Sequence, residues 1–229
     1  MKISKKHFYR FLPNRTFAKI KLKTMTDMYV ICSDLEGVFV PEVWVNVAKK
    51  TGIDKLKLTT RDIQDYDKLM KYRIEILEQE NLTLKDIQNV IAQIKPLDGA
   101  LEFIEWLKEL ARIVIVSDTF VEFADPLMAQ LNRPLLLCHS LITSDKNMIT
   151  GYKLRQADPK RKTVEAFQSL KYKVLAFGDS YNDISMLQQA EVGILFCPPE
   201  NVIKDYPEFP VAYNYAELKA LITKYIPEK

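Results

Sequence analysis

Three short apolar runs of this 229-residue chain end in an aspartate, and they constrain the fold more than any other feature. The runs are MYVICSD (28–34), RIVIVSD (112–118) and KVLAFGD (173–179). They are continuously apolar rather than alternating, which is typical of strands buried on both faces. A further run, VGILF (192–196), has the same character. Amphipathic segments with helical spacing separate the runs, so the sequence predicts an α/β fold with a parallel sheet and right-handed crossovers.

Residues 41–96, between the first two runs, contain no convincing strand. Gly52 is expected to close a first helix, and Asp65 to cap a second. Thr83, with an acid three residues later, resembles the capping box of a third helix that Pro96 ends. The sequence therefore predicts an all-helical insertion directly after the first strand.

Two local signals complete the expected secondary structure. Residues 141–154 predict a β-hairpin with its turn at 144–147. Further on, Asp158 is expected to cap a helix with its side chain, and Pro159 fits the first helical position.

Charge and composition exclude several classes of protein. Residues 1–27 carry a formal charge of +7 against +3 for the whole chain, so the remainder carries −4 and has no basic stripe for nucleic acid. This basic N-terminal extension is expected to be a poorly ordered tail. No apolar run approaches the roughly 18 residues of a membrane span. The three cysteines are widely spaced, without a Cys-x-x-Cys pattern, which favours reduced thiols and a cytoplasmic location.

The acids that end the strands are expected to form one site. In an open parallel sheet, ligands bind beyond the carboxyl ends of the strands. Asp34, Asp118 and Asp179 should therefore gather at one edge, together with Glu36 and Asp183. Carboxylates this close together need a cation or raised pKa values. Oxygen ligands without histidine indicate Mg²⁺.

A phosphate would suit the same edge of the sheet. The hydroxyls of Ser117 and Thr119 can bind it, and so can Lys160 near a helix start. Arg161 and Lys162 are open alternatives to Lys160 in that role.

Each of these residues also has an ordinary structural interpretation. A single aspartate after a strand usually caps a helix or forms a turn. Three of them, together with the Asp-x-Glu spacing and GDSYND (178–183), favour a site instead. His139 has no evident partner and is expected to be structural, and Trp44 and Trp106 are expected to pack in the core.

Four motifs resemble those of the haloacid dehalogenase superfamily of phosphotransferases. They are DLEGV (34–38), Ser117 in VSDTF, Lys160, and GDSYND (178–183). The resemblance implies a Rossmann-like parallel-sheet core, and the helical insertion resembles the small cap of phosphoserine phosphatases. The expected core is 28–42 with 96–229.

The corresponding cap is residues 43–95, and residues 1–27 lie outside the resemblance. Longer stretches, such as DLEGV.VPE.W and GY.LRQ.DPKR, resemble bacterial phosphoserine phosphatases that also act as homoserine phosphotransferases. Glu36 in the first motif and Ser-Asp-Thr in the second are typical of that subfamily.

The resemblance implies chemical roles for the acids. Asp34 would attack the phosphorus and form an aspartyl-phosphate. Glu36 would protonate the leaving oxygen and then activate the acceptor. Asp34, Asp179 and the backbone carbonyl of Glu36 would hold Mg²⁺, and Asp183 would belong to the metal site by orienting it.

The resemblance also implies binding roles. Ser117 and Lys160 would hold the phosphoryl oxygens. Glu42 would take the substrate ammonium and Arg73 its carboxylate. Further residues are expected at the substrate: Asp118, Thr119 and Asn182. The expected partner is a small molecule, O-phosphoserine with homoserine as a second acceptor, and a homodimer is left open beside a monomer.

Two other functions are open. The site would also suit a phosphatase of another small phosphomonoester. A receiver-type signalling domain likewise phosphorylates an aspartate at a strand end with Mg²⁺, but it has neither the helical insertion nor the late acidic motif. Catalytic hydrolysis of phosphoserine separates the enzyme from the receiver.

Overall fold

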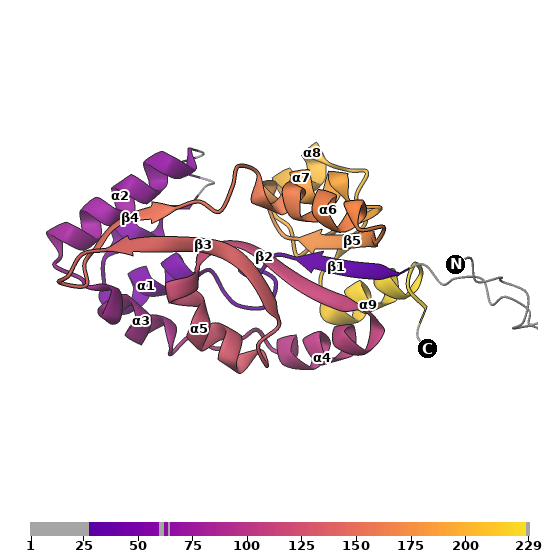
Figure 1. Ribbon diagram of the computed structural model, residues 1–229, viewed down its shortest axis with the longest axis horizontal. Coiled ribbons are helices and arrows are strands. Elements are labelled where there is room, and N and C mark those ends of the chain that lie inside the picture. Colours follow the sequence, from indigo (N-terminus) through magenta and orange to yellow (C-terminus); the bar gives the residue numbers. More distant parts are fainter. Residues whose placement is uncertain (1–27, 60–61, 64, 228–229) are drawn as a thin grey trace, which may run out of the picture.

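The computed structural model of the protein describes residues 28–59, 62–63 and 65–227, so the predicted extension of residues 1–27 lies outside the described part. Its centre is a seven-stranded sheet in the order β4-β3-β2-β1-β5-β6-β7 (Figure 1). All neighbouring strands are parallel except β3 and β4. The strands are β1 (Tyr29–Ser33), β2 (Arg112–Phe120), β3 (Leu135–Thr143), β4 (Ile149–Lys153), β5 (Lys173–Gly178), β6 (Val192–Phe196) and β7 (Val211–Ala212). The predicted α/β fold is therefore confirmed.

The sheet is buried on both faces because its central strands send apolar side chains to each side. In β1, Ile31 joins one apolar cluster, whereas Val30 and Cys32 join the other. One layer of helices is α6 (Pro159–Ser169), α7 (Ile184–Gln189) and α8 (Glu200–Asp205). The other contains α4 (Ala100–Leu110), α5 (Val121–Gln130) and α9 (Tyr215–Thr223) (Figure 1). This arrangement leaves the carboxyl ends of β1, β2 and β5 at one edge.

The segment after β1 forms helices, as predicted. These are α1 (Val43–Thr51), the 3₁₀ turn η1 (Asp54–Lys57), α2 (Tyr66–Gln79) and α3 (Leu84–Ile91). Gly52 closes α1 with a φ of 75°, Asp65 accepts a hydrogen bond from the N–H of Lys68, and Thr83 forms a full capping box. Helix α3 ends at Ile91, several residues before the predicted stop at Pro96.

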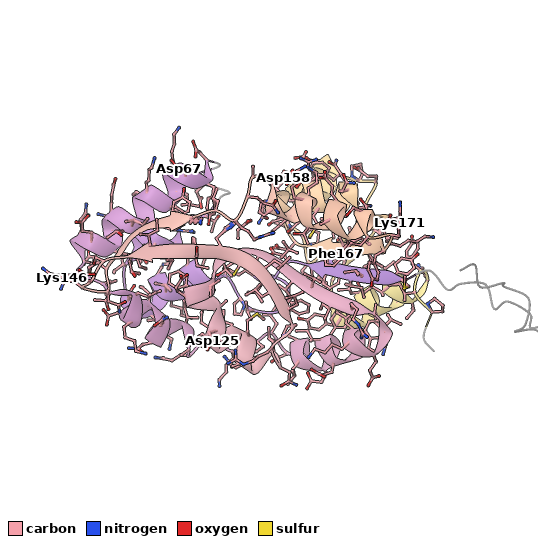
Figure 2. All side chains as sticks on the ribbon, in the orientation of Figure 1. Asp67, Asp125, Lys146, Asp158, Phe167 and Lys171 are labelled. Carbon is pink, nitrogen blue, oxygen red and sulfur yellow. The ribbon has the colours of Figure 1, made fainter. Side chains whose placement is uncertain are left out.

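These helices gather around the outer parts of β3 and β4, at one end of the molecule (Figure 1). The predicted hairpin is confirmed, since the N–H of Ser144 donates to the carbonyl of Met148 at 2.9 Å. The tip of the hairpin lies at Lys146, far from the core helices (Figure 2). Strand β3 begins earlier than predicted, at Leu135, because its first half pairs in parallel with β2 before its second half pairs with β4.

The prediction for Asp158 is wrong in its detail. Asp158 precedes α6, but its backbone is left-handed, with a φ of 48°, and its side chain does not cap the helix. The carboxylate instead accepts hydrogen bonds from Arg161 and from the hydroxyl of Ser185. Figure 2 labels Asp158 at the end of α6 nearest to α2. In the described part of the chain, no helix combines the length and the apolar character that crossing a membrane requires.

Candidate active site

Asp34 lies directly beyond β1, where the sheet ends. Its N–H donates to the carbonyl of Phe177 at 3.1 Å, so the backbone still follows β5, and its side chain is 4% exposed. One carboxylate oxygen accepts the N–H of Leu35 at 2.7 Å. The chain then turns at Gly37, whose φ is 73°. A Cβ at Gly37 would lie 2.5 Å from a carboxylate oxygen of Asp179, so only glycine lets this turn pass so close to the second acid.

Asp34, Asp179 and Asp183 form one buried group, in which each residue offers an oxygen within 4.8 Å of the others. Asp183 accepts the N–H groups of Asp179 and Ser180 at 2.9 and 3.1 Å through one oxygen. Its other oxygen accepts from Lys160 at 2.7 Å. Burial raises the pKa of Asp34 well above its usual value, and the charges of Asp183 and Asp179 raise it further, against the opposing effect of Lys160. The cluster thus concentrates negative charge in a place with little water.

Lys160 is the cation of this cluster. It is 2% exposed, and its ammonium lies 2.7 Å from Asp183, 3.1 Å from Asp34 and 3.6 Å from Asp118. Burial would lower the pKa of Lys160, but these three carboxylates outweigh it and raise the pKa well above the usual value. Lys160 therefore stays charged at any physiological pH.

The two alternatives to Lys160 point elsewhere. Arg161 and Lys162 are more than one-third exposed, and both form ion pairs with Glu165 on the surface of α6. Of the three basic residues considered from the sequence, Lys160 is the one that reaches the acids.

The end of β2 supplies the polar residues of the second motif. Ser117 and Thr119 are buried, and the N–H of Thr119 donates to the hydroxyl of Ser117 at 3.2 Å. Asp118 accepts a hydrogen bond from Asn182 at 2.9 Å. Burial alone would raise the pKa of Asp118, but Lys160, His139 and Asn182 together lower it below its usual value.

The donor chemistry of the acids fits a hard divalent cation. The group holds three carboxylates, and among the described residues no other cluster of three acids, histidines or cysteines is close enough to bind a metal. Oxygen donors without nitrogen or sulfur suit Mg²⁺. Both oxygens of Asp183 already accept hydrogen bonds, which suits this residue to orienting Lys160 and the loop after β5.

The opposite wall of the site comes from the helical insertion. Arg73 is 6% exposed, and its guanidinium lies 4.6 Å from the centre of the Trp44 ring. One of its terminal nitrogens donates to the carbonyl of Leu58 at 2.8 Å, but its Nε has no hydrogen-bond partner among the described residues. Burial lowers the pKa of Arg73 to about 10, which still leaves it charged.

Glu36 lies between the two walls. Its carboxylate accepts the N–H of Val43 at 2.8 Å, at the start of α1. Burial raises the pKa of Glu36 to about 7, and the nearby Glu42 also raises it, against the bond from Val43. A carboxyl group with this pKa can give and take a proton near neutral pH.

These residues enclose a cavity of about 90 Å³. It brings together most of the residues predicted from the sequence: Asp34, Glu36, Glu42, Arg73, Ser117, Asp118, Thr119, Asp179 and Asn182. Lys160 and Asp183 are not at its surface and lie behind Asp34 and Asp118. A larger cavity, of about 820 Å³, shares Asp118 and Asn182 with the first, so this hydrogen-bonded pair lies at the boundary between them.

Sequence reasoning missed several lining residues. Tyr66 and Leu69 on α2, and Thr59 before it, line the small cavity. Trp44 was expected only to pack, yet it lines the cavity beneath Arg73. The spacing of Tyr66, Leu69 and Arg73 places the three on one helix face, and this was the signal available. Trp106 does pack, stacking on Phe103 at 5.4 Å.

Known proteins resemble this chain at the level of both sequence and fold. Residues 18–191 match the family of haloacid dehalogenase-like hydrolases. The "Phosphoserine phosphatase ThrH" of Pseudomonas aeruginosa is 58% identical over 192 residues, which cover 84% of this chain and 94% of the relative. The "Phosphoserine phosphatase" of Pseudomonas syringae pv. tomato is 56% identical over 190 residues, or 83% of this chain and 80% of the relative.

A crystal structure of phosphoserine phosphatase in its apo form superposes with a TM-score of 0.69 at 21% identity, covering 87% of this chain and 99% of that one. A phospho-aspartyl intermediate analogue of phosphoserine phosphatase gives the same TM-score at 20% identity, covering 87% and 99%. At these identities the likeness concerns the fold. The family match over residues 18–191 and the 58% identity to the Pseudomonas aeruginosa relative show that the chain belongs to the family of haloacid dehalogenase-like hydrolases.

Proposed function

We propose that the protein is a Mg²⁺-dependent phosphoserine phosphatase that works through a phosphorylated Asp34. The observation that carries the proposal is the pairing of two unlike walls around one small cavity. The core wall holds Asp34 beside the Lys160 ammonium, and the insertion wall holds a buried Arg73 with an unpaired Nε. The names of the two Pseudomonas relatives support the same activity.

The substrate follows from the charges that the cavity offers. O-phosphoserine carries a phosphoryl group, an ammonium and a carboxylate. Arg73 can pair with the carboxylate, because its Nε has no hydrogen-bond partner among the described residues and each terminal nitrogen carries a second N–H besides the one given to Leu58 or Met70. Glu42 at the same cavity can take the ammonium. The phosphoryl group then faces Asp34, where Ser117 offers a hydroxyl at the cavity surface and the Lys160 ammonium lies 3.1 Å behind the Asp34 carboxylate.

The chain's own residues account for the proton and phosphoryl transfers. Asp34 attacks the phosphorus, the bond to the seryl oxygen breaks, and Glu36 protonates that oxygen as serine leaves. Glu36 is then a carboxylate and accepts a proton from the incoming water, whose oxygen displaces Asp34 from the phosphorus. A pKa near 7 suits Glu36 to both halves of this cycle.

The metal site would consist of Asp34, Asp179 and the carbonyl of Glu36, with Asp183 orienting it. When bound, Mg²⁺ neutralises negative charge on the transferring phosphoryl group. Without a cation, the carboxylates around Asp34 would repel the dianionic substrate.

We further propose that residues 43–95 act as a cap over a core of residues 28–42 and 96 onward, in a cytoplasmic protein. The cavity of about 90 Å³ lies below the roughly 300 Å³ at which ligand pockets usually begin. We propose that the present arrangement is a narrow state of the site, and that the insertion moves away from the core to admit the substrate.

Homoserine is a second acceptor for the same phosphoenzyme. It presents the same ammonium and carboxylate as serine and differs by one methylene, which pockets discriminate by only about 1–3 kcal/mol. A site that releases serine therefore cannot strongly exclude homoserine.

The experiment is a panel of phosphorylated metabolites assayed with Mg²⁺, followed by ³¹P NMR of phosphoserine with saturating homoserine. We expect phosphoserine to be the best substrate, chelation to abolish turnover, and an O-phosphohomoserine signal to grow. Preference for a phosphomonoester without a carboxylate would overturn the substrate assignment. Full activity in excess EDTA would overturn the proposed Mg²⁺ dependence. Inorganic phosphate as the sole product would overturn the proposed transfer to homoserine.

A further inference from the structure

His139 is a buried side chain without an assigned role. It lies on β3, is 3% exposed, and packs edge-on against the ring of Tyr66 at 6.3 Å. The pairing of β2 with β3 shifts register between Val116 and Phe120, and beyond the shift Phe120 pairs with His139. Irregularities of this kind often re-aim side chains next to active sites. Here the shift brings His139 beside Asp118, a contact that no sequence pattern predicted.

The two ring nitrogens of His139 have different partners. Nδ1 accepts the backbone N–H of Arg155 at 3.1 Å, so Nδ1 carries no proton in this arrangement. The neutral ring must then carry its proton on Nε2. Nε2 lies 3.5 Å from one carboxylate oxygen of Asp118, toward which this proton can be donated. The backbone of Arg155 thus fixes which nitrogen faces the acid.

Asp118 connects His139 to the phosphoryl site through its second oxygen. That oxygen accepts from Asn182 at 2.9 Å and lies 3.6 Å from the ammonium of Lys160. Lys160 is shared with Asp34 and Asp183 at shorter distances. If Asp118 were free to rotate, it could compete more strongly for the ammonium and draw it away from Asp34.

We propose that His139 is a positioning residue, which holds one oxygen of Asp118 so that the other keeps Asn182 and Lys160 in place for the transferred phosphoryl group. This inference rests on the proposed function of the site. A purely structural histidine would need only its bond from Arg155 and its aromatic contacts. The placement of Nε2 toward Asp118 adds a contact that leads directly to Lys160.

Two substitutions of His139 distinguish its hydrogen bond from Arg155 from its contact with Asp118. In H139N, the amide oxygen can still accept the N–H of Arg155, but the side chain is too short to reach Asp118. In H139Q, the amide nitrogen can take the place of Nε2 and donate to Asp118. We expect H139N to lower kcat for phosphoserine about tenfold, with KM changed by less than threefold, and H139Q to recover most of kcat. The change should appear in kcat because Lys160 acts on the transferring group.

A control substitution and a double-mutant cycle test whether a lower kcat comes from a general loss of packing. Leu141 is a buried residue of the same strand, so L141A should lower the melting temperature without lowering kcat. In a D118N background, H139N should add little, because His139 acts through Asp118. The inference is overturned if H139N keeps its kcat, if L141A loses as much, if H139Q is no better than H139N, or if the effects of H139N and D118N multiply.

A measurement without any substitution at His139 guards against variants that do not fold. The chain has only two histidines, His7 and His139, so an H7N protein assigns their imidazole NMR signals. We expect the proton of His139 on Nε2 rather than on Nδ1, and a clear shift of that signal in D118N. A proton on Nδ1 would overturn the inference. Wild-type turnover of phosphoserine tests the proposed function separately, since that measurement involves no change at His139.

Discussion

The two walls of the cavity differ in how their charges are balanced. On the core wall, Lys160 contacts three carboxylates, and Asp183 accepts three hydrogen bonds. On the insertion wall, the Nε of Arg73 has no hydrogen-bond partner among the described residues, and between the two walls burial and the nearby Glu42 raise the pKa of Glu36. The core wall is therefore organised before substrate arrives, whereas the insertion wall holds charges that await a partner.

This difference fits a division of labour. Phosphoryl transfer needs groups that are already fixed where charge develops, because reorganisation would cost rate. Recognition of an amino acid needs charges that gain their partner only when the correct substrate binds. Changes to the core wall should thus affect every substrate alike, whereas changes to the insertion wall should affect substrates selectively.

The largest expected effect is at Asp34. D34N removes the proposed nucleophile, so turnover of every phosphomonoester should fall by about 10⁴-fold or more. The fold should survive. Burial and the nearby Asp183 and Asp179 raise the pKa of Asp34, which means that they disfavour a charged carboxylate there, and a neutral amide carries no such charge. Steady-state assays and thermal melting check both parts. Substantial activity in D34N would remove Asp34 from the chemistry.

A second change breaks the core wall without touching a charge. A Cβ at Gly178 would lie 2.3 Å from the carboxyl carbon of Asp183, so G178A must displace Asp183 and with it Lys160. We expect kcat to fall about 10²-fold for all substrates. In the control G151A, the new methyl meets its nearest neighbour at 3.5 Å, so activity should persist. Equal activity in both proteins would mean that the position of Asp183 is unimportant.

Arg73 tests the insertion wall. R73A removes the proposed charged partner of the substrate carboxylate, so kcat/KM for phosphoserine should fall about 10- to 150-fold. Phosphoethanolamine has the ammonium but no carboxylate, and its kcat/KM should change less than threefold. R73K keeps the charge but loses the fork, so it should recover only part of the loss. Equal losses on both substrates would contradict a carboxylate clamp.

The sequence predicted most of the fold because the signals were local. The apolar runs of β1, β2, β5 and β6 and the caps of the inserted helices each depend on a few neighbouring residues. The gathering of acids followed from one topological rule, that parallel strands share an edge. The first half of β3 was not predicted as a strand. It follows Pro134 and is only half-buried, so it lacks the continuous burial of the other strands.

The remaining errors concern contacts that depend on three-dimensional register. The pairing of His139 with Asp118 requires a shift between β2 and β3 that no local pattern encodes. The backbone of Asp158 is left-handed, and its partner Ser185 lies in a different helix. Strand β7 has only two residues, too few to produce a periodic signal.

The smallest expected effect concerns the joint between the two walls. The hydroxyl of Tyr66 on α2 donates to the backbone carbonyl of Asp118 on β2 at 3.0 Å, so it links the insertion to the core. Y66F removes this bond and keeps the ring. A hydrogen bond contributes about 0.5–1.5 kcal/mol net, so the closed arrangement should weaken and kcat/KM for phosphoserine should fall about 2- to 12-fold.

Tyr152 provides a matched control for this last prediction. Its hydroxyl donates to Asp67 at 2.5 Å, an exposed bond that also joins α2 to the core, through β4, but that does not involve Asp118. Y152F loses an equivalent bond without loosening the contact with Asp118, so its kcat/KM should stay within twofold. Because Y66F weakens closure rather than chemistry, single-turnover rates at saturating phosphoserine should match the wild type. A Y66F protein that loses its single-turnover rate would place Tyr66 in the chemistry, and one that behaves as Y152F would show that this hydrogen bond does not hold the site closed.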